Sequence, residues 1–369
     1  MLKPERIISV DFLRGLTVAG MILVNNPGSW EHIYAPLEHS VWNGCTPTDM
    51  VFPFFLFIVG ISISYSLSVP KASTDNQSEL VIKIIRRAVV LFALGLLLNF
   101  ISDFSFSSLR IPGVLQRIAL VFLVSALLFL KTSVRTKIIL SITILVSYWL
   151  LMTCIPLPGV GVSNLEPTTN IGAWLDNLLL KNHLWKFSVT WDPEGILGTF
   201  PAIVSGLIGV LTGIWLKRDV EKKEKIIRLF VVGNFMILTA LAWDIVFPIN
   251  KSLWTSSFVL FSSGIALNVL AICYWLIDVQ EDRKFTSPFL AFGSNAIAAY
   301  MFSEIMSNAS YLLIETNGQS ISVKELIFQF LSVKWINLKF LSLVLALTWL
   351  AMIWLPMNWL YKRKILIKV

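Results

Sequence analysis

Apolar runs of about twenty residues recur along almost the whole chain, and they restrict the fold more than any other feature. Inside lipid every backbone N–H and C=O group must be satisfied within the protein, so such runs form transmembrane helices. Charged residues make up 14% of the 369 residues, against about 25% in a typical soluble protein. We therefore predict an all-α membrane protein. The composition disfavours the alternative, a soluble protein with a large core.

The hydropathy pattern predicts a polytopic bundle of about ten transmembrane helices in a single domain, residues 1–369. The first fifteen residues lead into the first helix without a small-residue cleavage site, so we expect no removed signal peptide. The expected helices cover residues 9–28, 49–68, 84–102, 112–130, 137–155, 196–216, 227–247, 256–277, 287–306 and 337–361.

The positions of the basic residues predict the orientation of this bundle. Of the 30 Lys and Arg residues, 22 fall near the termini or in the loops on the same side as the termini. Cytoplasmic loops of membrane proteins are enriched in Lys and Arg, so both termini are predicted to be cytoplasmic. The same charge also suits a cytosolic anionic ligand, and topology alone remains the simpler explanation.

The stretch 25–60 runs from the end of the first predicted helix into the second, and the roughly twenty polar and aromatic residues between them lie on the external side. It contains His32 and His39, two of the three histidines in the chain, together with Asp49 at the start of the second helix. A general base or nucleophile in this loop would face the aqueous phase. The helix before it ends in Asn25 and Asn26, whose amides are costly in lipid and are expected to face the bundle interior.

Three other polar features interrupt the apolar runs, and each has a structural and a functional interpretation. Gln116 and Arg117 lie inside a predicted helix, where they serve either an ion pair between helices or a ligand. Arg14 follows Asp11 by three residues, on the same face of the first helix. The two side chains either only neutralise each other's charge or take part in the function. Asp192 and Glu194 precede the helix at 196–216, and they either cap it or attract a cationic amine.

These residues lie in motifs through which the chain resembles the heparan-α-glucosaminide N-acetyltransferase family. The motifs are SVDFLRGLTVAGMILVN, EHSVWNGCTPTDMVFPFFLFIVG, RIPGVLQRIAL, WDPEGILGT, FPINKSLWTSSFVL and GSNAIAAYMFSE, in this order. The resemblance implies a multi-pass acyltransferase that uses cytosolic acetyl-CoA to acetylate an amino sugar across the membrane. It also implies a bacterial relative in the cytoplasmic (inner) membrane.

The resemblance assigns the catalytic histidine to His39 and the asparagine that ends the first helix to Asn25. Acetyl-CoA is the expected co-substrate, and a glucosamine or terminal glucosaminide is the expected acceptor. We assign acetyl-CoA binding to the residues Arg14, Asn26, Gln116 and Arg117, and acceptor binding to Asp49, Asp192 and Glu194. The lipid bilayer is an expected partner, nucleic acid is not, and a homodimer is left open.

The residues leave two mechanisms and a rival function open. His39 serves as a general base on the acceptor amine or as a nucleophile that carries the acetyl group, and Asn25 suits an oxyanion hole. A secondary transporter of a sugar or organic anion is the alternative, because Asp244 and Glu304 also lie in apolar surroundings. Three scattered cysteines and three histidines predict neither a metal site nor a disulfide.

Overall fold

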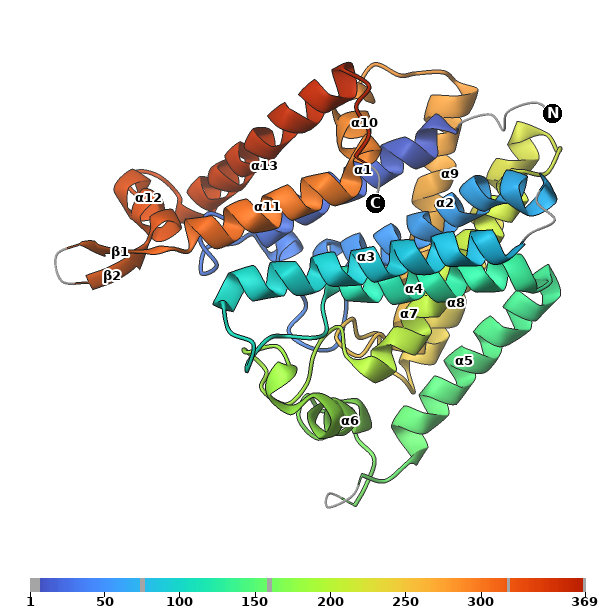
Figure 1. Cartoon of the computed structure of the whole chain (residues 1–369), viewed down its shortest axis with the longest axis horizontal. Helices are drawn as coiled ribbons and strands as arrows, with labels where there is room; N and C mark the ends of the chain where they lie inside the picture. Colours follow the sequence, from blue (N-terminus) through green and yellow to red (C-terminus); the bar gives the residue numbers. More distant parts are fainter. Residues whose placement is uncertain (1–6, 74–76, 158–160, 317–318, 368–369) are drawn as a thin grey trace.

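The computed structural model describes residues 7–73, 77–157, 161–316 and 319–367. Helices occupy most of each of the ten segments predicted to be helical (Figure 1). The long helices are α1 (Ile8–Asn25), α2 (Val51–Ser73), α3 (Gln77–Asp103), α4 (Val114–Lys131), α5 (Val134–Cys154), α7 (Ile196–Leu216), α8 (Lys222–Asp244), α9 (Ser256–Tyr274) and α13 (Leu338–Lys362). Shorter helices are α6 (Ile171–Leu180), α10 (Ser287–Ser294), α11 (Ala296–Ser310) and α12 (Val323–Leu331).

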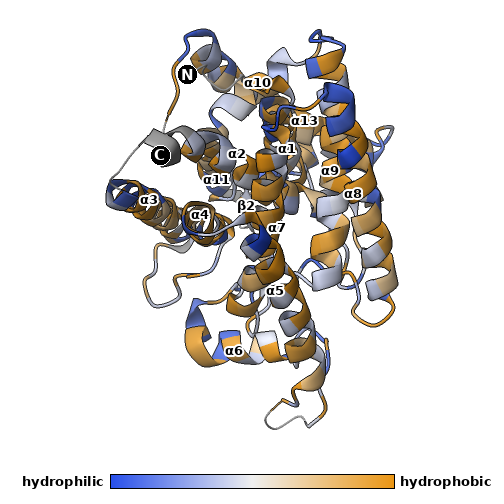
Figure 2. Cartoon of the chain, turned by 90° about the vertical axis from the view of Figure 1, so that its right-hand side faces the viewer, coloured by the Kyte–Doolittle hydropathy of each residue, from blue (hydrophilic) through white to orange (hydrophobic). Residues whose placement is uncertain are grey.

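Eight of the described helices are long and apolar enough to cross a membrane, and the pair α10–α11 would make a ninth. The 27-residue helix α3 is not among them and packs along α4. Hydrophobic residues cover most of the length of α5, α7 and α8, with hydrophilic residues gathered toward helix ends and loops (Figure 2). The structure therefore supports a polytopic α-helical membrane protein with eight or nine candidate spans, fewer than the ten predicted.

Helices α2 and α7 are in close contact at the centre of the bundle because glycine faces backbone where they cross. A Cβ atom added at Gly209 would lie 2.0 Å from the carbonyl oxygen of Phe57, and one at Gly60 would lie 2.0 Å from that of Gly206. Small residues allow such close backbone contact between membrane helices. The largest cluster of buried apolar side chains surrounds this pair and draws on α1, α2, α4, α7 and α9.

The helix predicted at 287–306 is broken, and that prediction of one continuous helix was wrong. The axes of α10 and α11 differ by 85°, and Asn295 between them has a non-helical backbone (φ −128°, ψ 44°). Its side chain donates to the carbonyl oxygen of Ile365 and accepts from the amide of Ile367. The segment after α13 thus turns back and occupies the break (Figure 1).

A short helix and a hairpin lie between α11 and α13. The helix is α12, and a two-stranded antiparallel hairpin of β1 (Leu313–Thr316) and β2 (Gln319–Ser322) precedes it. Ser322 caps α12 by accepting from the amide of Glu325 at 3.2 Å. The hairpin is a small exception to the predicted all-α class.

Loops predicted to be external meet on one side of the molecule. The loop before α2 is bonded to the loop before α9, since the amide of Gly44 donates to the carbonyl oxygen of Ile249 at 2.8 Å. Its Trp42 indole donates to the Leu165 carbonyl oxygen, in the segment before α7. The loop before α4 joins them through His183, whose Nδ1 lies 2.8 Å from the Leu109 carbonyl oxygen.

Candidate active site

His39 and Asp49 form a close pair in the loop between α1 and α2. His39 Nδ1 lies 2.6 Å from Asp49 Oδ1, and the imidazole is 44% exposed while the carboxylate is buried. A 3-10 helix, Pro47–Met50, holds the acid in place. Its N-cap is Thr46, whose side chain and backbone amide both reach the Asp49 carboxylate in a capping box. The helix start predicted at residue 49 falls within this 3-10 helix, two residues before α2 begins at Val51.

The environment of Asp49 determines which nitrogen of His39 is free. The amides of Ser40 and Thr46 donate to Asp49 Oδ2 at 3.1 and 3.0 Å, and so stabilise an ionised carboxylate. An ionised carboxylate at Nδ1 accepts a hydrogen bond from the N–H group of that nitrogen and leaves the Nε2 lone pair unused. Asp49 was predicted to contact the acceptor. It is fully buried, and its carboxylate is hydrogen-bonded to Ser40, Thr46 and His39.

Lys251 completes this group from the loop between α8 and α9. Its Nζ lies 3.1 Å from Nδ1 and 3.4 Å from Nε2 of His39, and 3.6 Å from Asp49 Oδ1. Burial lowers the pKa of Lys251, while the charges of Asp49 and Glu194 act in the opposite direction. Lys251 was assigned no role from the sequence. It is separated from His39 by about two hundred residues, and no local pattern connects them.

Arg110 binds both acids that precede α7. Its Nε and Nη2 donate to the two carboxylate oxygens of Asp192 at 2.8 and 2.6 Å, and Nη2 also donates to Glu194 at 2.6 Å. Burial raises the pKa of Asp192, whereas at Glu194 the charges of Arg110, Arg117 and Lys251 outweigh burial and lower the pKa. The sequence had singled out both acids but not Arg110, because an arginine in a polar loop carries no signal of its own.

The acid that caps the start of α7 is Asp176 on α6, not Asp192 or Glu194. Its Oδ1 accepts from the amide of Ile196, the first residue of that helix, at 2.9 Å. Asp192 instead accepts from the amide of Glu194 at 2.9 Å. The alternative in which Asp192 and Glu194 merely cap α7 is therefore not what the structure shows.

Arg117 is buried beside this cluster, and only part of its hydrogen-bonding capacity is used. Its Nη2 donates to the carbonyl oxygen of Gly195 at 3.1 Å, and its guanidinium lies 5.0 Å from the centre of the Trp254 ring. Within the described part of the chain, Nε and Nη1 of Arg117 and Nε2 of Gln116 lack hydrogen-bond partners. Buried donors without acceptors are uncommon, and they suit a ligand that brings acceptor oxygens.

The other predicted site residues lie along α1. Arg14 donates to Asp11 and Ser62 at 3.0 and 2.8 Å. Asn26 donates to Ser303 of α11 at 3.3 Å and is buried, while Asn25 at the end of α1 is half-buried. Arg14 precedes Asn25 by eleven residues in the same helix, or roughly 16 Å at 1.5 Å per residue, and so belongs to the other end of the bundle.

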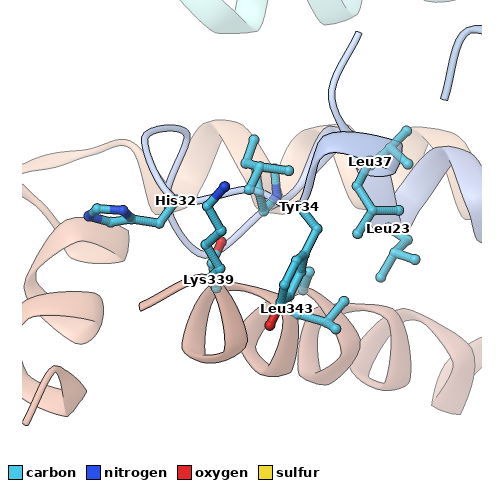
Figure 3. A pocket seen from close by; sticks show the side chains of 11 residues that line it. Leu23, His32, Tyr34, Leu37, Lys339 and Leu343 are labelled. Carbon is cyan, nitrogen blue, oxygen red and sulfur yellow. The ribbon is translucent and has the colours of Figure 1, made fainter. Parts of the chain in front are cut away.

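Two small pockets flank the site. One adjoins the acid cluster and is lined by Asp176, Asp192, Trp191, Tyr148 and Ser252, among others. The other lies between the end of α1 and α13, where Tyr34 extends toward Leu343 and Lys339 (Figure 3). Neither includes His39, which is open to solvent at its own position.

Comparison with known proteins identifies the family of the chain. Residues 6–225 match the family model described as heparan-alpha-glucosaminide N-acetyltransferase, catalytic. The chain belongs to this family. It is 31% identical to the mouse protein named heparan-alpha-glucosaminide N-acetyltransferase and 32% identical to the human one, with 83% of the chain covered in each case. The matches cover 54% of either relative, so the chain spans about half the length of the curated relatives it matches.

The part of the chain that matches the family model contains almost every residue of the site. His39, Asp49, Arg110, Arg117 and the acids before α7 lie within residues 6–225, whereas Lys251 lies beyond that range. The family resemblance predicted from the sequence motifs is thereby confirmed. The described residues contain no group of three or more His, Cys, Asp or Glu side chains arranged to hold a metal ion.

Proposed function

We propose that this protein is a transmembrane N-acetyltransferase that moves the acetyl group of cytosolic acetyl-CoA to the amine of an amino sugar on the external side. The observation that carries this proposal is the contact between His39 and Asp49 at 2.6 Å, in a chain that belongs to an acetyltransferase family. The imidazole of His39 is exposed where the external loops meet. Glucosamine or a terminal glucosaminide is the acceptor we favour. The cytoplasmic membrane of a bacterium is the location we propose.

His39 acts on the acceptor amine as a general base. An ammonium group has no lone pair, so the amine must lose a proton before it can attack a carbonyl carbon. The unused Nε2 lone pair can take that proton, and Asp49 stabilises the imidazolium that results. The proton then passes from His39 to the leaving thiolate or to water.

Acetyl-CoA supplies the acetyl group as an activated thioester. Arg117 and Gln116 suit this ligand because their unpartnered donors are buried, and a carbonyl or amide oxygen would satisfy them. Asn25 ends α1 near the external side, and we assign its amide to the carbonyl oxygen that becomes negative during transfer. Arg14 and Asn26 hold side chains of α2 and α11, so we assign them to shaping the path between these helices.

Asp192 and Glu194 remain our candidates for attracting the acceptor ammonium. Arg110 pairs with both carboxylates, and Arg117 and Lys251 also act on Glu194, so the acceptor ammonium would bind beside this ion cluster and not on a free carboxylate. The pocket lined by Asp176, Asp192 and Trp191 adjoins this cluster. Aromatic and carboxylate side chains together suit a sugar that carries an amine.

Replacing His39 tests the proposal. Loss of a general base typically reduces the rate about 10² to 10⁴-fold, so His39→Ala should lose most turnover while acetyl-CoA binding persists. His32→Ala is the matched control, since His32 lies in the same loop and stacks on Phe328 at 5.9 Å, away from Asp49. Wild-type turnover by His39→Ala with a panel of amino sugars would contradict the assignment.

A second measurement separates the two mechanisms and the rival function. Acetyl-CoA mixed with the protein alone releases one equivalent of free CoA if His39 carries the acetyl group, and none if transfer is direct. We expect direct transfer. A transporter would release no CoA with any amine. Asp244, one residue that suggested transport, is instead used locally, where it accepts from the amide of Ile249 at 2.6 Å.

A further inference from the structure

The ammonium group of Lys251 lies over the face of the His39 ring. Its Nζ is nearly equidistant from the two ring nitrogens, at 3.1 and 3.4 Å. A group at these distances within the ring plane would collide with the carbon between the nitrogens, so it must lie above the plane. The in-plane lone pair of Nε2 therefore remains open to a substrate, although a cation is close to the ring.

The loop that carries Lys251 is held rigidly against the loop that carries His39. Asn250 donates to the side-chain oxygen of Asn43 at 3.2 Å and accepts from the amide of Leu253 at 2.9 Å. Trp254 adopts a left-handed backbone (φ 54°), and its amide donates to the carbonyl oxygen of Lys251. The Trp254 side chain is 1% exposed. Lys251 is thus held in place from both sides, and its contact with His39 is built into the fold.

Two charges of opposite sign act on His39. Asp49 at 2.6 Å favours the protonated imidazolium, which has no lone pair and cannot act as a base. Lys251 opposes this effect from the other side of the ring. The groups that act on Lys251 itself are Asp49, Glu194 and Cys45, all of which favour its charged form against burial. The acid and the lysine therefore have complementary effects on the histidine.

We propose that Lys251 is a positioning residue that keeps the His39 imidazole neutral and its Nε2 available, while Asp49 fixes the orientation of the ring. An acid alone would orient the histidine but also protonate it. The added cation allows orientation without protonation. This inference rests on the proposed role of His39 as a base.

The chain offers a direct test, because it contains only three histidines. The protein is labelled with ¹³C at histidine Cε1, purified in detergent micelles, and titrated by NMR, with His39→Gln used to assign the His39 signal. In Lys251→Met the midpoint of the His39 titration should rise by about one pH unit, as expected for loss of a nearby cation. Lys251→Arg should restore the wild-type midpoint.

Two controls make the result specific to Lys251. Lys339→Met removes a cation from the external pocket that contains His32, and it should leave the His39 midpoint unchanged. The signals of His32 and His183 report folding of each variant. If Lys251→Met does not fold, Lys251→Gln provides a second uncharged variant for the same titration.

Turnover gives an independent measurement. The acid limb of the pH–rate profile of Lys251→Met should move upward by the same interval as the NMR midpoint, with about a tenfold loss below that limb and recovery at high pH. An unchanged His39 midpoint in Lys251→Met would overturn the inference. The NMR titration needs no substrate, so absence of acetyl transfer would refute the proposed function without affecting it.

Discussion

Asp176 is a buried acid whose charge opposes folding. Its carboxylate accepts from the amide of Ile196, but burial still raises its pKa to about 6. The unfolded chain holds the same proton with a pKa of about 3.9, so the folded state binds it more tightly. Stability therefore falls as the pH rises from about 4 to about 6 and remains lower above that range. With about 1.4 kcal/mol for each pKa unit, the ionised carboxylate costs roughly 3 kcal/mol at neutral pH.

Asp176→Asn should remove this pH dependence. The asparagine retains an oxygen for the Ile196 amide but has no charge. As the pH rises from 4 to 6, the wild type should therefore lose stability while the variant does not, so the unfolding temperature of the variant should increase relative to that of the wild type. Thermal unfolding in detergent over this range measures the difference. Asp219→Asn, at an exposed position before α8, is the control. A difference that does not vary with pH would contradict the raised pKa.

Individual site residues could be predicted from the sequence only where their partners are close along the chain. His39 and Asp49 are ten residues apart in one polar loop, and a loop of that length folds back on itself. Arg110 lies 82 residues from Asp192, and Lys251 lies 212 from His39. Their positions depend on which helices pack together, and no pattern of residue types within a segment encodes that.

At the scale of elements, the contact between α2 and α7 positions much of the site. The His39 loop and its 3-10 helix lead directly into α2, while Glu194 and Gly195 lead into α7. Any change that separates these helices would also separate the histidine from the acid cluster. The glycines at the crossing are therefore important for the site as well as for the bundle.

Gly209→Ala should destabilise the protein. The added methyl group would lie 2.0 Å from the backbone oxygen of Phe57, which cannot move without shifting α2. Such overpacking typically costs about 1–3 kcal/mol. Gly20→Ala is a matched control in another apolar helix, because its added methyl meets nothing closer than 3.6 Å. Thermal unfolding in detergent should separate the two variants, and equal unfolding temperatures would argue against close contact of α2 and α7.

Helices were predictable from apolar length, whereas their interruptions were not. The run at 287–306 contains no proline after Pro288, so hydropathy predicted a continuous helix. The break at Asn295 is fixed by hydrogen bonds to Ile365 and Ile367, about seventy residues away. Propensity cannot detect a bend that depends on the other end of the chain.

For the molecule as a whole, the mutual contacts of the loops support the prediction that these loops lie on one and the same side. The loops before α2, α4, α7 and α9 touch one another, and all were assigned to the external side from the distribution of basic residues. Helical connections that alternate between two sides of a membrane would bring these loops together in this way, provided that α3, which packs along α4 but is not a candidate span by apolar length, also connects the two sides. The side of the membrane on which they lie is still a prediction.

The native cysteines can establish that orientation. Cys154 is exposed at the end of α5, whereas Cys273 is buried and burial raises the pKa of the Cys45 thiol to about 12. Only a thiolate reacts readily with maleimide, so Cys45 should react slowly at neutral pH. A membrane-impermeant maleimide added to intact cells should therefore label the wild-type protein at Cys154, and Cys154→Ser should abolish the signal.

The opposite end of the same helix provides the matched control. Arg135 is exposed near the start of α5, and α5 has 21 residues, enough to span about 30 Å. In the Cys154→Ser background, Arg135→Cys should be labelled only after the cells are permeabilised. The reverse pattern would place the termini outside and His39 in the cytoplasm. Acetyl-CoA and the base would then share one compartment, and the proposed transfer across the membrane would have to be abandoned even if the acetyltransferase activity itself were confirmed.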